Sequence, residues 1–259
     1  PGLPDNHCYC GWYNGHGVDL GKLHKGFWQA VKPGWMYGCG EFGAEGLEAV
    51  EIMRKYYPPH WLPQTEEQEA QWKPERIVKA QTGPFHYMWF ETQDTLADWV
   101  AQSQGHQERM TRLMTEAFRR DSRMNSLAIH LFIDAFPAGW MKSIMDVERN
   151  AKPAYFAYRE ALTPLMVNLR SDRRTYWAGE PVEVEAWVCN DRPHSPTATE
   201  LRSLPGRGVE GVVDGVPVAV GGPALLRERG LAEPAELFAT AAAWRERGAS
   251  VLYVVRDDT

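Results

Sequence analysis

The sequence predicts an α/β protein whose first part forms a parallel sheet, followed by an antiparallel segment and a small α+β segment. Three observations predict this order. Strand-like and helix-like runs alternate up to about residue 163, two strand-like runs flank an AGEP turn after Pro164, and the residue types change at Leu204. Alternating strands and helices are typical of a parallel sheet, whereas strands joined by a short turn pair antiparallel.

Three apolar segments are the expected parallel strands. They are HCYCGWY (7–13), GWMYGCG (34–40) and SLAIHLFIDAF (126–136). Helix-like segments lie at 44–57, 66–80, 93–121 and 145–162. We therefore expect the three strands to be neighbours in one sheet, with their carboxyl ends at one edge.

The composition excludes several classes of protein. The chain of 259 residues is 44% hydrophobic and 24% charged, as in globular domains. Its net charge of -6 argues against a nucleic-acid surface. It has no apolar run near the roughly 20 residues that span a bilayer. The opening PGLPDNHCYC lacks an initiator Met and a signal peptide, which suggests a cut through a larger protein.

The four cysteines form no metal-binding pattern. Cys8, Cys10, Cys39 and Cys189 include no CxxC pair, so we expect no metal site. Buried thiols in a reducing compartment are the ordinary interpretation, and we expect a cytoplasmic location.

A change of composition marks the last part of the chain. From Leu204 onward there is no Lys, Met, Cys, His, Asn or Gln, and only Trp244 of the eleven tryptophans. This indicates a domain boundary or a join between two unrelated genes. We expect an irregular linker between about 190 and 204. The expected domains are 1–163, 164–203 and 204–259.

Glu41 stands out at the end of an apolar strand-like run, in the stretch CGEFGAEG. An acid ahead of a helix-like run can serve the helix dipole. It can also be a catalytic carboxylate at the carboxyl end of a barrel strand. The residues alone leave both interpretations open.

Residues 5 to 200 resemble the C-terminal part of a family 2 glycoside hydrolase. The resemblance rests on WYNGHGVDLGKLHKG, YGCGEFGAEGL and FIDAFPAGWMKSIMDVERNAKPAYFAYREAL. It implies the C-terminal part of a (β/α)8 barrel, and VNLRSDRRTYWAGEPVEVEAWVCND resembles the start of the β-sandwich that follows the barrel.

The resemblance assigns roles to particular residues. It implies Glu41 as the nucleophile of a retaining enzyme acting on β-glycosides, with Glu45 as a fallback that more simply serves the first turn of a helix. Trp140 fits core packing equally well. Residues that could contact the carbohydrate are Tyr13, His16, Trp89 and Asp134.

The second catalytic carboxyl of that family is absent. It would lie in an Asn-Glu pair, and no such pair occurs in this sequence. Only about three of eight barrel strands are present. We therefore expect the chain alone to be inactive on ordinary glycosides, without a cofactor for this part.

The segment LPGRGVEGVVDGVPVAVGGPALLRERG (204–230) resembles the nucleotide-binding domain of heavy-metal-transporting P-type ATPases. The resemblance implies that Gly206, Gly208 and Gly221 approach ATP, since a side chain would block close approach. His194 precedes Ser rather than Pro, so no adenine-binding role is assigned to it. We expect the hairpin GVEGVVDG–VPVAVGG and a helix near 223–229. An ATP-binding module, or a chimeric chain with no activity, thus remain alternatives to the glycosidase fragment.

Overall fold

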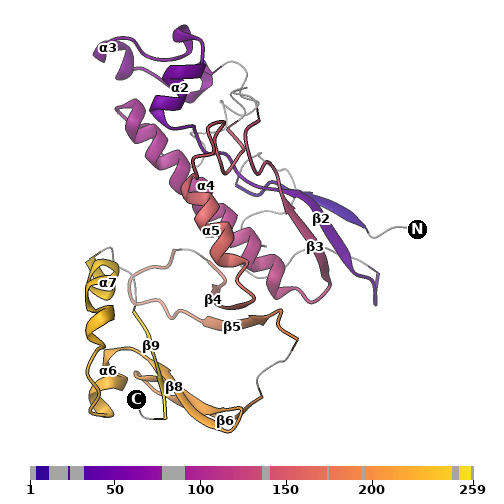
Figure 1. Cartoon of the computed structure of the whole chain (residues 1–259), viewed down its shortest axis with the longest axis vertical. Coiled ribbons are helices and arrows are strands. Elements are labelled where there is room, and N and C mark those ends of the chain that lie inside the picture. The colour runs from indigo at the N-terminus through magenta and orange to yellow at the C-terminus, as the bar shows by residue number, and fades with distance from the viewer. Residues whose placement is uncertain are drawn as a thin grey trace. The chain divides into compact units, whose positions relative to one another are not determined.

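The computed structural model describes residues 4–11, 23, 32–77, 91–135, 141–173, 175–193, 197–246 and 251–257. The chain divides into two compact units (Figure 1). Unit 1 is Pro1–Asp191, and unit 2 is Arg192–Thr259. Each is described by itself.

Unit 1 contains a three-stranded parallel sheet in the order β1-β2-β3. The strands are β1 (Asp5–Cys8), β2 (Tyr37–Phe42) and β3 (Met124–Ile129). This confirms that the three predicted segments are parallel neighbours. In the described part of the chain these strands form no closed barrel. Because all three run in one direction, their carboxyl ends meet at a single edge.

The described part of unit 1 also contains α-helices. They are α2 (Val50–Tyr56), α3 (Glu66–Glu69), α4 (Leu96–Arg120) and α5 (Pro153–Ala161), with short 3-10 turns η1 (Pro59–Trp61) and η2 (Pro74–Arg76). The long helix α4 begins where the Thr95 side chain accepts a hydrogen bond from the Asp98 backbone N–H. Figure 1 shows α5 lying along α4.

Small residues bring α5 close to α4. Its buried side chains are Ala154, Ala157 and Ala161, spaced along one helical face. Under the sheet, Phe42 of β2 makes an edge-to-face contact with Phe118 of α4, at 4.9 Å between ring centroids. This contact fixes the carboxyl end of β2 on the core.

Three predicted helices are shorter than expected. The run 66–80 is α-helical only over Glu66–Glu69 among its described residues. The run 44–57 becomes helical only at Val50. The run 145–162 begins its helix at Pro153, because Asp146 accepts backbone hydrogen bonds from Glu148 and Asn150 and so closes a turn instead. Proline then suits the first helical position, where its missing N–H costs nothing.

An antiparallel pair follows in unit 1, as the AGEP turn predicts. Strand β4 (Leu165–Ser171) pairs with β5 (Val184–Asn190). On one face of this pair, Met166 of β4 and Cys189 of β5 are buried. On the other face, Val167 and Val188 are exposed. These two strands form a sheet of their own, not a sandwich of two sheets.

Unit 2 is a four-stranded antiparallel sheet in the order β6-β7-β8-β9 with two helices. The predicted hairpin is confirmed as β7 (Gly208–Val213) and β8 (Val216–Gly221), and the predicted helix as α6 (Pro223–Glu228). The remaining elements are β6 (Ala198–Leu204), α7 (Ala235–Glu246) and β9 (Tyr253–Arg256).

The expected irregular linker is wrong over 198–204, which is strand β6. This edge strand pairs with β7, which satisfies the backbone groups on the paired side. At its open end, the Thr197 N–H donates to the Asp214 carboxylate and the Asp214 N–H donates to the Thr197 carbonyl. The sheet of unit 2 therefore begins before the change of composition at Leu204.

Candidate functional site

Glu41 is the penultimate residue of β2, at the carboxyl edge of the parallel sheet. Its side chain is 37% exposed, whereas its neighbour Phe42 is fully buried. Gly43 follows because a Cβ there would lie 2.8 Å from the His130 carbonyl oxygen. The chain after β2 passes close to the end of β3, so position 43 requires glycine. The carboxylate of Glu41 remains accessible to solvent.

Three side chains from the neighbouring strands surround the carboxylate of Glu41. The Tyr9 hydroxyl, just after β1, donates a hydrogen bond to Oε2. The Nδ1 atom of His7, the register partner of Glu41 on β1, lies 3.4 Å from the same oxygen. The Nδ1 atom of His130, the first residue after β3, lies 3.9 Å from it. All three strands therefore contribute to one site.

The surroundings of Glu41 keep it ionised. The hydrogen bond from Tyr9 is the main cause that lowers the pKa of Glu41, aided by the charges of His130, His7 and Lys142. Burial lowers the pKa of His130, against the pull of Glu41. At neutral pH the site thus pairs an anionic carboxylate with a neutral His130 imidazole.

Lys142 is a buried cation beside the site. Lys142 is only 4% exposed, and burial lowers the pKa of its side chain to about 8. The charges of Glu45 and Glu41 oppose that shift. Glu45 is buried in a non-helical segment, five residues before α2 begins, so its predicted place in a helical first turn is wrong.

The remaining predicted carbohydrate contacts are only partly placed. Tyr13, His16 and Trp89 lie outside the described residues, as does Trp140. Asp134 follows β3, and its backbone N–H donates to the Met145 carbonyl. Its charge raises the pKa of Glu48 and of Tyr57, which places it near a buried part of unit 1.

Sequence reasoning missed His7, Tyr9 and His130. They lie at or just beyond the ends of the observed strands β1 and β3. The predicted strands 7–13 and 126–136 placed Tyr9 and His130 in strand interiors, so no sequence signal pointed to them. Their convergence on Glu41 depends on the register of parallel strands, which is set by the packed structure.

The glycines of unit 2 are explained by contacts between backbones. A Cβ at Gly208 would lie 1.9 Å from the Val220 carbonyl oxygen, and one at Gly221 would lie 1.9 Å from the Arg207 carbonyl oxygen. Gly206 instead occupies a turn with φ of +71° and has open space around it. The glycine requirement at 208 and 221 therefore needs no ligand.

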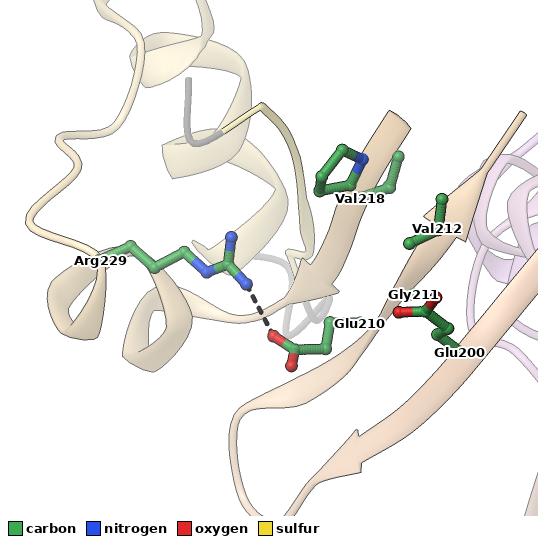
Figure 2. Close-up of a pocket in the computed structure, with 7 residues that line it drawn as sticks. Glu200, Glu210, Gly211, Val212, Val218 and Arg229 are labelled. Atoms are coloured by element: carbon green, nitrogen blue, oxygen red, sulfur yellow. Dashed lines mark hydrogen bonds and ion pairs between the residues drawn. The ribbon is translucent and has the colours of Figure 1, made fainter. Parts of the chain in front are cut away.

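A pocket of about 340 Å³ lies on unit 2, between strands β6 to β8 and the end of α6. Figure 2 shows Arg229, the residue just after α6, reaching to Glu210, and their side chains form an ion pair of 2.8 Å. Glu210 also pairs with Arg202. Arg229, the basic residue that lines this pocket, is thus already paired with Glu210, a carboxylate that lines the same pocket.

Neither a metal cluster nor a membrane span is found in the described ranges. No group of three or more His, Cys, Asp or Glu side chains there has the geometry to hold a metal ion. None of the helices described is long and apolar enough to cross a membrane. All four cysteines are free and buried.

The chain is similar to solved structures but to no family model. No curated protein sequence is similar to the chain. A β-D-mannosidase from Dictyoglomus thermophilum matches with a TM-score of 0.41 and 17% sequence identity. The match covers 78% of this chain and 21% of the mannosidase chain. The chain therefore spans about a fifth of that protein's length.

Proposed function

We propose that this chain is part of a retaining β-glycoside hydrolase and that it carries the nucleophile, Glu41. The observation that carries the proposal is an ionised, solvent-accessible carboxylate, hydrogen-bonded by Tyr9, at the carboxyl edge of a parallel sheet. Active sites of barrel enzymes lie at this edge. The sequence resemblance to family 2 glycoside hydrolases supports the same residue.

The surroundings of Glu41 suit both steps of a double displacement. In the first step a carboxylate oxygen bonds to the anomeric carbon while the bond to the leaving oxygen breaks. In the second step a water oxygen bonds to the anomeric carbon, the bond to the carboxylate breaks, and the water gives its proton to the acid/base carboxyl that this chain lacks. A lowered pKa serves both, because the carboxylate is already deprotonated for attack and leaves as a stable anion.

The proton for the leaving group is proposed to come from outside this chain. Retaining enzymes hold a second carboxyl about 5 Å from the nucleophile to protonate that oxygen. The sequence lacks the Asn-Glu pair that would supply it. Proton donation contributes roughly 10²–10⁴-fold, so hydrolysis of ordinary glycosides by this chain should be close to background.

An activated fluorosugar tests the nucleophile without the missing acid. A dinitrophenyl 2-deoxy-2-fluoro-β-glycoside needs no protonation to depart, so we expect a single covalent sugar on Glu41, located by peptide mass analysis. The series would include mannoside, galactoside and glucuronide. Glu41→Gln should abolish labelling, and Glu45→Gln should retain it. Labelling that persists in Glu41→Gln, or none with any sugar, would contradict the assignment.

We propose no nucleotide-binding function for unit 2. Gly208 and Gly221 are required by the backbone contacts described above. The proposed organisation is a barrel part over 1–163 and a sandwich-like segment from 164, followed by the separate sheet of unit 2.

A further inference from the structure

A second cavity on unit 1 is lined by arginines. It has a volume of about 230 Å³ and lies between the carboxyl end of α4 and the region from β4 to Tyr176. Arg120, Arg170 and Arg173 line it, together with the hydroxyl-bearing residues Ser171 and Tyr176. No acidic residue belongs to its described lining.

Arg120 is an incompletely matched cation. As the last residue of α4, it donates from Nη1 to the Asn168 side-chain oxygen at 2.6 Å. Its Nε is buried and has no hydrogen-bond partner within the described structure. No described carboxylate lies within ion-pair distance of it, while burial and the charge of Arg170 lower its pKa against the charge of Glu116. A desolvated cation with no carboxylate in direct contact is unfavourable, even with the charges of Glu116 and Glu185 nearby, and an anion would relieve that cost.

The other two arginines are held in place by carboxylates outside the cavity lining. Arg170 pairs with Asp172 at 3.0 Å and with Glu185 at 2.7 Å. Arg173 pairs with Glu180 and lies over the Tyr176 ring, 4.6 Å from its centroid. These contacts restrain both guanidinium groups, which reduces the entropy that binding would cost.

We propose that this cavity binds a phosphate or sulfate group. Guanidinium groups match the geometry of such oxyanions with paired N–H donors. The volume of the cavity limits the size of the ligand, because sites for drug-sized molecules occupy roughly 300–1,000 Å³. At about 230 Å³ the cavity suits a single oxyanion or the charged group of a larger molecule. The inference is independent of the proposed role of Glu41.

Titration of the whole chain with inorganic phosphate tests the proposal. The Nε–H resonance of Arg120 should shift saturably in nitrogen-proton spectra, and chloride at equal ionic strength should not reproduce the shift. Arg120→Gln should weaken binding about tenfold or more, as expected for a lost charged hydrogen bond. Arg112→Gln, an exposed arginine of the same helix that pairs with Glu160, should bind as the wild type does.

A second variant covers the case in which Arg120→Gln fails to fold. Arg173 is 51% exposed, so Arg173→Gln should fold and still lose several-fold in affinity. Glucose 6-phosphate binding more tightly than phosphate would assign the site to a sugar phosphate, and equal affinity would assign it to the free ion. A shift no larger than that with chloride, or equal weakening in Arg112→Gln, would overturn the proposal.

Discussion

The Tyr9 hydroxyl donates a hydrogen bond to the carboxylate of Glu41 and so connects the carboxyl ends of β1 and β2. Tyr9 is buried, while the Glu41 side chain is 37% exposed. A fixed donor therefore orients an accessible acceptor. The hydrogen bond stabilises the charged form of the acceptor, which makes Tyr9 a positioning residue for the proposed nucleophile.

Tyr9→Phe should raise the pKa of Glu41, because it removes the largest cause of its lowering. The carboxyl carbon of Glu41, assigned with Glu41→Gln, reports this pKa by carbon-detected pH titration. Tyr56→Phe is the matched control, since it removes a tyrosine hydroxyl that donates to the distant Glu148. An unchanged Glu41 titration in Tyr9→Phe would mean that the hydrogen bond does not control its ionisation.

Lys142 should make unit 1 more stable at alkaline pH. Its folded pKa of about 8 is below the ordinary value of 10.5, so the charged form is penalised in the folded state. The penalty is complete below pH 8 and disappears as pH rises to 10.5. Over that window stability should rise by about 3 kcal/mol from this group.

Urea unfolding followed by tryptophan fluorescence measures this effect in unit 1, which holds ten of the eleven tryptophans. Lys142→Met should be more stable than the wild type at pH 7 and lose that advantage by pH 10.5. Lys142→Arg keeps its charge throughout, so its stability should lack the rise. Parallel wild-type and Lys142→Arg profiles would show that Lys142 does not titrate in this range.

The position of Glu41 could be predicted from the sequence, whereas its partners could not. An apolar run ending in GEFG predicts a strand with an acid at its carboxyl end, and the structure has this arrangement. The contacts from His7 and His130 depend on which residues lie opposite each other in neighbouring parallel strands. No local pattern encodes that register, because it follows from packing over many residues.

Helix boundaries failed for a similar reason. The run from 145 has helical periodicity, but Asp146 takes the backbone N–H groups of Glu148 and Asn150 for a turn. Side-chain to backbone hydrogen bonds of this kind compete with helix formation and are weakly marked in sequence. In unit 2, by contrast, the glycines and alternating valines of 208–221 sufficed to predict the hairpin.

Glu48 and Lys152 should form a strongly coupled pair. Their side chains are 1% and 4% exposed, with 2.8 Å between Lys152 Nζ and Glu48 Oε1. Glu48→Ala would leave the buried ammonium of Lys152 with the Gly46 carbonyl as its remaining acceptor. The free energy of unfolding should fall by roughly 3–5 kcal/mol. Glu148→Ala, which breaks an exposed pair with Lys55, should destabilise unit 1 much less, because solvent screens exposed charges. Equal unfolding midpoints in urea for the two variants would refute the coupling.

Adjacent glycines of unit 2 should respond in opposite ways to alanine. At Gly221 a Cβ would lie 1.9 Å from the Arg207 carbonyl oxygen, a backbone atom that cannot move without shifting the turn between β6 and β7. At Gly222 no atom lies within 4 Å, and its φ of -79° is open to any residue. Gly221→Ala should therefore cost about 1–3 kcal/mol or more by overpacking. Gly222→Ala should be neutral or stabilise by about 0.4–1 kcal/mol, because alanine restricts the unfolded chain.

Amide hydrogen exchange at Glu210 and Ala219, register partners in β7 and β8, measures both effects within unit 2. Faster exchange at these amides in Gly221→Ala alone is the expected result. It would show that this glycine serves the approach of two backbones. If Gly221→Ala kept wild-type exchange, the close contact would not be a constraint, and a ligand would again be needed to explain the glycine.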